Sequence, residues 1–147
     1  MPGRTSIDWD SWEAGKDLGV SVVFITKEFI FNYVQAVEDY DPIFLNSTDG
    51  EKAGFGGLVA PASYHAQFTY MKWATGDEGW VPQGSVHVKQ KFQFRGIVRE
   101  GDQLYTKVTM GDKYEKNGRK YVVYKTTVTN QHGEKICTGE MINLLPS

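Results

Sequence analysis

Four long runs of alternating apolar and polar residues fill the second half of the chain, and they limit what it can fold into. Alternation with a period of two is typical of strands that bury one face. Asn117-Gly118 and His132-Gly133 separate the later runs, and Asn-Gly is the strongest short-range hairpin signal. The pattern therefore predicts an antiparallel meander of four strands, at residues 85–98, 104–114, 121–129 and 135–145.

The first half of the chain has a different pattern. Residues 19–25 are apolar and β-branched, which predicts one further strand. Thr26 can cap a helix, and apolar residues then recur every three or four positions to residue 38, as on one face of an amphipathic helix. Residues 39–57 are rich in Gly, Asp and Asn, so we expect a loop there.

A second helix is expected from Pro61 to about Trp73. Proline suits the first helical turn because its missing N–H would be unpaired there. Residues 62–71 contain no Asp, Glu, Lys or Arg, so this helix has no charged face and should be mostly buried. The expected fold class is α+β, with a sheet of five or slightly more strands wrapped round a buried central helix.

Length and composition exclude several classes of protein. The 147 residues correspond to one domain, with a polar lead-in at 1–18 and the domain at 19–147. A net charge of -2 argues against nucleic acid as a partner. No run of about 18 apolar residues predicts a membrane span, so no membrane partner is expected. The single Cys137 and the separated histidines predict no metal site, and a reducing cytoplasm is the simplest compartment.

Two strings in the middle of the chain carry a family resemblance. They are Glu38-Asp39-Tyr40-Asp41-Pro42-Ile43-Phe44-Leu45-Asn46 and Gly56-Gly57-Leu58-Val59-Ala60-Pro61. Together they resemble the MaoC family of hot-dog-fold (R)-specific enoyl-CoA hydratases and 3-hydroxyacyl dehydratases. The family motif is Gly-Asp-x-Asn-Pro-Ile-His, followed by a Gly-rich loop into the central helix. The resemblance implies a hot-dog domain, a coenzyme A thioester as the substrate moiety and no other cofactor.

The same resemblance locates a degenerate catalytic pair. In the family, the motif Asp and His hold and activate the water that adds to the double bond. Asp39 falls on the Asp position, Asp41 replaces the Asn, and Phe44 stands at the His position. A phenyl ring neither donates nor accepts a proton, and losing one positioned acid or base typically costs about 10²–10⁴ in rate.

The expected substrate-binding residues are Asp41, Gly57, Val59, Ala60, Pro61 and His65. In active family members a glycine N–H near the start of the central helix polarises the thioester carbonyl. Pro61 stands near that position and has no N–H to give.

Each of these residues also has a structural interpretation. Asp39 is either a retained base or a residue of an Asx-turn. Asp41 either shares a proton with Asp39 or orders the turn before Pro42. His65 either replaces the missing histidine or is a satisfied core residue, which is the commoner case. Lys89, Lys91 and Arg95 either bind a CoA phosphate or form a solvated strand face.

These observations favour a supporting subunit of a MaoC-type hydratase or dehydratase. It would form a homodimer, or a heterodimer with a MaoC-like catalytic subunit, and shape the acyl-CoA pocket. An alternative is a non-enzymatic acyl-CoA-binding or scaffold subunit, for example beside a thiolase. A hot-dog thioesterase is disfavoured, because residues 60–74 contain no Asp or Glu. Phe68, Trp73 and Trp80 either line a substrate pocket or belong to the core.

Overall fold

The computed structural model describes residues 9–69 and 81–147. Its elements in chain order are β1 (Asp17–Phe24), α1 (Lys27–Val37), η1 (Pro42–Phe44), α2 (Ser47–Lys52), η2 (Ala62–Thr69), β2 (Val86–Phe94), β3 (Gln103–Lys116), β4 (Arg119–Thr129) and β5 (Lys135–Leu144). Within these residues, no helix has the length and apolar character needed to cross a membrane.

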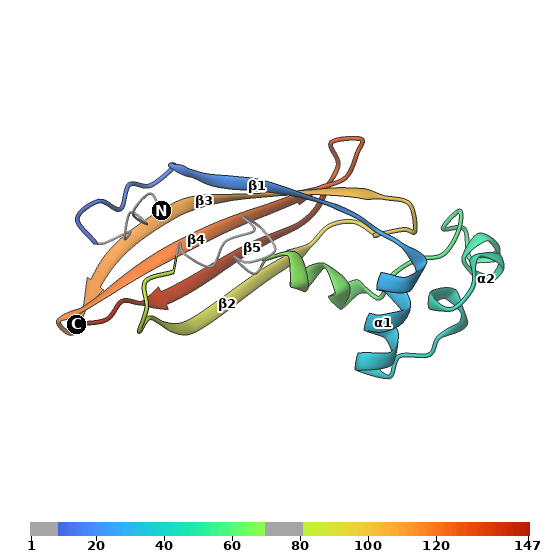
Figure 1. Ribbon diagram of the computed structural model, residues 1–147, viewed down its shortest axis with the longest axis horizontal. Helices are drawn as coiled ribbons and strands as arrows, with labels where there is room; N and C mark the ends of the chain where they lie inside the picture. Colours follow the sequence, from blue (N-terminus) through green and yellow to red (C-terminus); the bar gives the residue numbers. More distant parts are fainter. Residues whose placement is uncertain (1–8, 70–80) are drawn as a thin grey trace, which may run out of the picture.

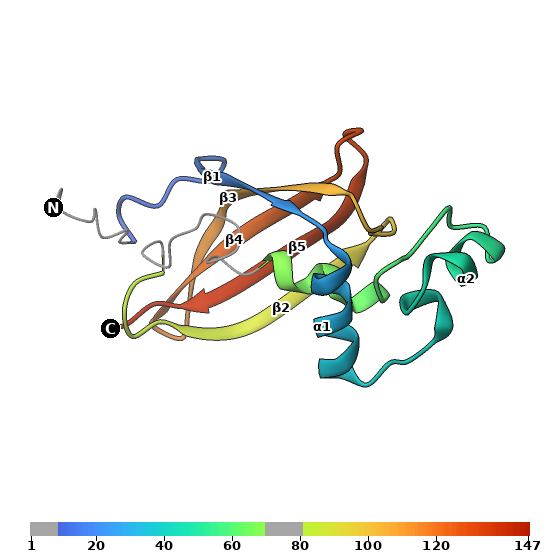
Figure 2. The ribbon, with the colours of Figure 1, turned by 45° about the vertical axis from the view of Figure 1, so that its right-hand side comes forward.

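One antiparallel sheet of five strands dominates the molecule, in the order β1-β3-β4-β5-β2 (Figure 1). The two helices α1 and α2 gather at one end of this sheet, and the C-terminus lies at the other end (Figures 1 and 2). The predicted α+β class is confirmed. The predicted four-strand meander is right only for β3, β4 and β5, because β1 pairs with the free side of β3 and β2 lies beyond β5 at the far edge. Because β1 and β2 are the two edges, each of them pairs on one side only.

The β3–β4 hairpin forms where the Asn-Gly signal predicts it. Asn117 and Gly118 have φ values of 54° and 71°, the left-handed conformation that a tight two-residue turn demands. The strands then pair with Lys116 opposite Arg119, and the register shifts between Met110 and Lys113. Local turn chemistry was therefore enough to place this connection.

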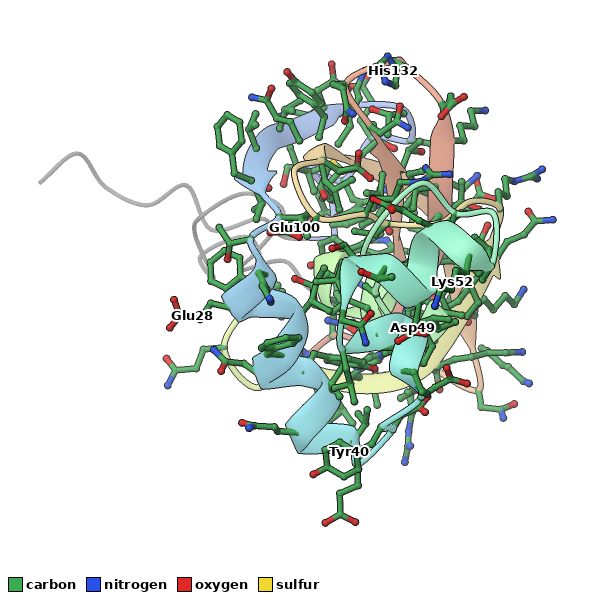
Figure 3. All side chains as sticks on the ribbon, turned by 90° about the vertical axis from the view of Figure 1, so that its right-hand side faces the viewer. Glu28, Tyr40, Asp49, Lys52, Glu100 and His132 are labelled. Atoms are coloured by element: carbon green, nitrogen blue, oxygen red, sulfur yellow. The ribbon has the colours of Figure 1, made fainter. Side chains whose placement is uncertain are left out.

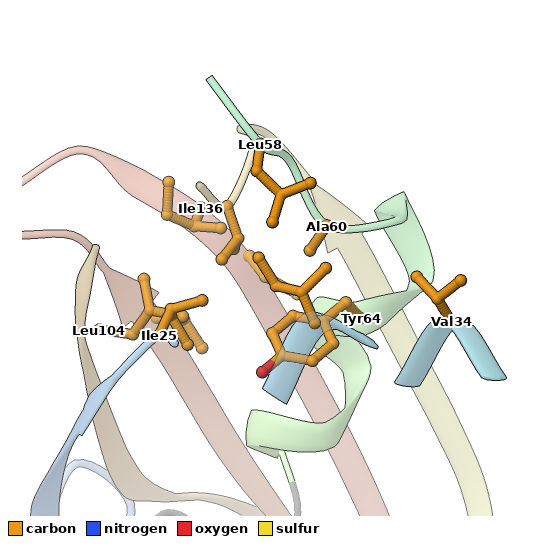
Figure 4. Packing of buried hydrophobic residues seen from close by; sticks show 11 residues of the cluster. Ile25, Val34, Leu58, Ala60, Tyr64, Leu104 and Ile136 are labelled. Atoms are coloured by element: carbon orange, nitrogen blue, oxygen red, sulfur yellow. The ribbon is translucent and has the colours of Figure 1, made fainter. Parts of the chain in front are cut away.

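The main core lies between the sheet and the segments that cover one of its faces (Figure 4). Ile30 and Val34 of α1 are buried against sheet residues such as Leu104 and Ile136. Their four-residue spacing places both on one helix face, as the periodicity predicts. The full buried set is Ile25, Ile30, Val34, Leu58, Ala60, Tyr64, Val98, Leu104, Val128, Ile136 and Cys137.

A second cluster fastens the N-terminal lead-in to the far end of the sheet. Trp12 is only 4% exposed and packs edge-on against Tyr124, with ring centroids 5.0 Å apart. Its indole Nε1 donates to the carbonyl of Gly111 at 2.8 Å. Buried Trp needs such an acceptor for its N–H. Trp12 therefore attaches the lead-in to the sheet.

The predicted loop at residues 39–57 is in part wrong, because it contains η1 and α2. Asn46 caps α2 by accepting a hydrogen bond from the Asp49 N–H at 2.8 Å. The Asn-x-x-Asp spacing resembles a capping box, and it is the signal that predicts a helix start here. Gly50 lies inside α2. Glycine is unfavourable inside helices, so its presence led the sequence pattern to predict a loop here.

The central helix differs from its prediction in type and burial. Residues 62–69 form a 3-10 helix, η2, and its charge-free composition does not bury all of it. Tyr64 and His65 are buried, whereas Ala62 and Ser63 are exposed. The remainder of the predicted helix, including Trp73, lies outside the described residues, as does Trp80. Nothing described tests the role suggested for Phe68.

Candidate functional site

The candidate site begins where α1 ends. Glu38 takes a left-handed conformation with φ 56°, and the Asp39 N–H donates to the Val34 carbonyl at 3.3 Å. The chain then leaves the helix with the Asp39 side chain exposed. The neighbouring Tyr40 projects away from the molecule at the lower edge of Figure 3. Asp39 therefore lies at the surface of this chain rather than in an enclosed pocket.

Asp41 has a structural task in the next turn. Its Oδ1 accepts a hydrogen bond from the Ile43 N–H at 3.1 Å and so caps η1, with Pro42 in the first helical turn. In the described part of the chain, no hydrogen bond joins Asp41 to Asp39. The geometry supports the turn-ordering interpretation of Asp41.

Phe44 occupies the histidine position of the motif and points toward apolar partners. Its backbone N–H donates to the Asp41 carbonyl at 2.9 Å, which closes the η1 turn. The ring is half-buried and packs with Leu45 against the main core. An imidazole in this place would lose apolar packing.

The two motif strings meet through the backbone. The Val59 N–H donates to the Ile43 carbonyl at 3.5 Å, and the Ala60 N–H donates to the Val98 carbonyl at 2.9 Å. Val59 also forms an isolated bridge with Arg99. Leu58, Val59 and Ala60 are all buried. The structure therefore joins the two motif strings at Ile43 and Val59, through backbone rather than through free side chains.

Glycines allow this close approach. Gly57 has φ 151°, and no atom lies near the place where its Cβ would be. A Cβ at Gly50 would overlap the Gly57 carbonyl oxygen, so only glycine fits inside α2 at this point. The α2 helix thus holds the strand-like segment 57–60 in place.

Pro61 precedes η2 and has no backbone N–H with which to donate a hydrogen bond. Pro61 is buried, and its carbonyl accepts from the Tyr64 N–H at 2.9 Å. Beside it, the Tyr33 hydroxyl and the Ser63 Oγ share a hydrogen bond of 2.6 Å. Tyr33 also packs edge-on against Tyr64, and burial raises the pKa of Tyr64 to about 12. Sequence reasoning missed this Tyr33–Ser63 pair, because the residues lie 30 positions apart.

His65 is completely buried and does not replace the missing histidine. Its Nε2 lies 2.7 Å from the Gly96 carbonyl oxygen, which can only accept, so Nε2 carries the hydrogen. Nδ1 then presents an unprotonated lone pair, and it is buried without a partner. Burial lowers the pKa of His65, although the hydrogen bond to Gly96 opposes that effect. Because it is fully buried and bonded to backbone, His65 is a core residue.

The other two histidines lie elsewhere. His87 is on the exposed strand β2, and His132 stands in the β4–β5 loop, where its Nε2 is 3.4 Å from the Gln131 amide nitrogen. Figure 3 shows His132 at the opposite side of the view from Tyr40, the neighbour of Asp39. None of the three imidazoles has a hydrogen bond to Asp39 in the described structure.

This geometry limits the chemistry of the site. Neither residues 9–69 nor residues 81–147 hold a group of His, Cys, Asp and Glu that suits a metal ion. An exposed carboxylate without a partner cannot position a water between an acid and a base. Among residues 9–69 and 81–147, no imidazole is hydrogen-bonded to the Asp39 carboxylate.

A family model fits most of the chain. The model, described as the FAS1-like dehydratase domain region, matches residues 14–139. The chain belongs to this family. A UPF0336 protein of Mycobacterium tuberculosis is 28% identical over 118 residues, which cover 76% of this chain and 73% of the relative. The MaoC-like resemblance seen in the two motif strings is thereby confirmed.

Solved structures share the hot-dog fold. The R-hydratase PhaJ1 of Pseudomonas aeruginosa superposes with a TM-score of 0.79 at 21% identity, over 97% of this chain and 87% of that one. The HadBC complex of M. tuberculosis, a 3R-hydroxyacyl-ACP dehydratase, gives a TM-score of 0.67 at 21% identity, over 88% and 96% of the two chains. At these identities the likeness shows the fold, and the site must be argued from its own residues.

Proposed function

We propose that this chain is a supporting subunit of a MaoC-type hydratase or dehydratase, paired in the cytoplasm with a catalytic homologue. The observation that carries the proposal is Phe44, half-buried in the core at the position of the family's histidine. Pro61 adds a second missing element, because it cannot donate the N–H that polarises a thioester carbonyl. Two losses in one site disfavour an independent catalyst.

The remaining architecture supports a role in binding. The motif turns are capped by Asp41 and Asn46, and the segment 57–60 is buried and hydrogen-bonded. The caps at Asp41 and Asn46 keep the motif segment ordered, which supports a retained role for it. We therefore assign the acyl-CoA pocket wall to Gly57, Val59, Ala60, Pro61 and the Asp41 turn. The partner supplies the Asp and His that act on the water.

A partner would also complete the sheet. The edge strand β2 exposes apolar side chains, among them Phe92 at 39% and Phe94 at 45%. Exposed edges with apolar side chains are hazards that proteins cover. Pairing of β2 with an edge strand of the catalytic homologue would bury them and bring the two motif segments toward a shared pocket. The HadBC complex is a heteromeric assembly of chains with this fold, which supports a partner subunit here.

The experiment is isolation of the complex from the source cells through an affinity tag on this chain. We expect a companion protein that carries the full Asp and His motif. The purified complex should hydrate a trans-2-enoyl thioester. A companion without the motif, or a complex that binds acyl-CoA and hydrates nothing, would contradict the proposal and favour a binding or scaffold role instead.

A further inference from the structure

Strand β2 is the most exposed element of the sheet. Eight of its nine positions are exposed and one is half-buried, although β5 pairs with it along its whole length. One row of backbone N–H and C=O groups therefore faces away from the sheet, as at every edge strand. The free side of β2 is an open template for another strand.

The two faces of β2 carry different chemistry. Phe92 and Phe94 lie opposite Gly139 and Cys137, on the face that covers the core, and their rings stack with centroids 5.8 Å apart. Phe94 also contacts the buried His65 ring at 5.7 Å. This exposed aromatic pair continues the core outward. Edge strands that avoid pairing normally carry charged side chains rather than exposed aromatic rings.

The opposite face of β2 is cationic. Lys89 and Lys91 lie on it, and Arg95 follows directly after the last residue of the strand, with Gln93 between. Residues 85–98 contain no Asp or Glu. From the neighbouring strand, Glu140 contacts Lys91 at 3.7 Å, and Lys125 of β4 lies directly opposite Glu140. This carboxylate therefore has a lysine directly opposite it on each neighbouring strand. Lys89 lies opposite the apolar Ile142, and Arg95 donates to the Gln93 side chain.

Self-pairing of β2 would bring these charges together. Two copies related by a two-fold axis perpendicular to the sheet pair antiparallel, and directly opposite residues share one face. Every register centred between Lys89 and Gln93 then places a cation opposite a cation: Lys89 on Lys89, Lys89 on Lys91, Lys91 on Lys91, Lys89 on Arg95, or Lys91 on Arg95. Like charges directly opposite one another destabilise an antiparallel pair.

We infer that β2 selects its partner by charge: it pairs with an edge strand that carries carboxylates opposite Lys89, Lys91 and Arg95, and it rejects a second copy of itself. The aromatic pair on the other face supplies apolar contact for either partner, whereas the cationic row discriminates between them. This inference rests on the proposed function for the partner's identity as a MaoC-like chain. It concerns assembly, so it can fail independently of any activity.

The test inverts the charges on β2, so that a variant chain carries carboxylates opposite the cations of the wild-type chain. A charge-inverted variant combines Lys89→Glu, Lys91→Glu, Arg95→Glu and Glu140→Lys, which keeps the 91–140 pair with its signs exchanged. Sedimentation equilibrium would measure self-association of the wild-type chain, of the variant and of their equimolar mixture. We expect the mixture to dimerise at least about tenfold more tightly than either chain alone, since several opposed pairs change from repulsive to attractive.

Salt distinguishes the charge mechanism from simple apolar contact. Raising the ionic strength should weaken the mixed dimer and strengthen any wild-type homodimer, because screening acts on attraction and repulsion alike. A matched control carries Lys16→Glu, Lys52→Glu, Lys116→Glu and Glu51→Lys, with the same net charge away from β2. Its mixture with wild type should associate no better than wild type alone. Circular dichroism confirms that each variant is folded.

Two results would overturn the inference. A wild-type chain that dimerises as tightly as the mixture would show that the cations do not oppose self-pairing. A mixture that stays monomeric would show that β2 is a blunted edge and not a docking strand. Hydration activity enters neither result, so an active isolated chain would remove the proposed function and leave this measurement unaffected.

Discussion

The motif segment at residues 39–65 and the edge strand β2 differ in how completely their groups are used. In the motif segment, Asp41 and Asn46 cap short helices, and the backbone of Val59 and Ala60 is hydrogen-bonded to neighbouring elements. In β2, one backbone edge faces away from the sheet and Phe94 remains 45% exposed. The first region satisfies its hydrogen bonds within one chain, whereas β2 leaves one edge of its backbone unpaired.

The side chains of the two regions differ as well. In the motif segment, Phe44 packs half-buried against the core, and Asp41 caps the turn before it. Where a partner would attach, the surface is apolar on one face and cationic on the other. Under the proposed function, the motif segment shapes a pocket and β2 docks a partner. The following changes test that division from the largest expected effect to the smallest.

Gly50→Ala should be the most damaging change in the motif segment. The added Cβ would overlap the Gly57 carbonyl oxygen, which belongs to backbone and cannot rotate away. We expect a loss of about 3 kcal/mol in the free energy of unfolding. Urea denaturation would measure it, with the exposed Lys52→Ala in the same helix as the control, expected within about 0.5 kcal/mol of wild type.

Phe44→Ala should cost about 2 kcal/mol, because a half-buried ring leaves the core. Phe44→His tests the chemistry at the same position. With Asp39 exposed and no imidazole bonded to it, the restored histidine should destabilise the chain without producing enoyl-CoA hydration. Hydration that rises about 10²-fold or more in Phe44→His would show that Asp39 and residue 44 share a working site.

Acid should destabilise the fold through His65. Burial lowers its folded-state pKa, so the unfolded chain binds this proton more readily than the native chain does. Stability from the neutral ring is therefore complete above the unfolded pKa of about 6.5 and falls as pH drops below it, by at most about 1.4 kcal/mol per pH unit. His65→Gln should flatten this dependence between pH 7 and 5. His87→Gln, on exposed β2, should leave it unchanged, and the same slope in both variants would exclude His65 as its source.

Asn46→Ala removes the cap of α2 and should cost about 1 kcal/mol. Asn46→Ser restores an oxygen acceptor for the Asp49 N–H and should recover most of that loss. Thermal unfolding of the three chains would show the difference. Equal midpoints for the alanine and serine variants would mean that packing, and not the cap, holds α2.

The sequence predicts those parts of the fold that depend on local rules. Alternation located the strands, Asn117-Gly118 located a hairpin, and the apolar character of Phe44 agrees with its place against the core. Local patterns fail where distant residues decide the outcome. Gly50 looks like a loop residue, yet it is needed because the backbone at Gly57 comes close.

The site shows the same limit. The acceptor of His65 is the Gly96 carbonyl, and the partner of Tyr33 is Ser63, both about 30 positions away. No spacing in the sequence indicates either contact, because each depends on how η2 lies against the sheet and α1. The 3-10 form of η2 is equally hidden, since its composition suits an ordinary buried helix.

The rate at which the purified chain alone hydrates trans-2-enoyl-CoA tests the central claim most directly. Without a proton carrier at Phe44, we expect turnover at least about 10²-fold below that of the chain in complex with its partner. A monomeric, partner-free preparation that turns over as fast as the complex would contradict the account.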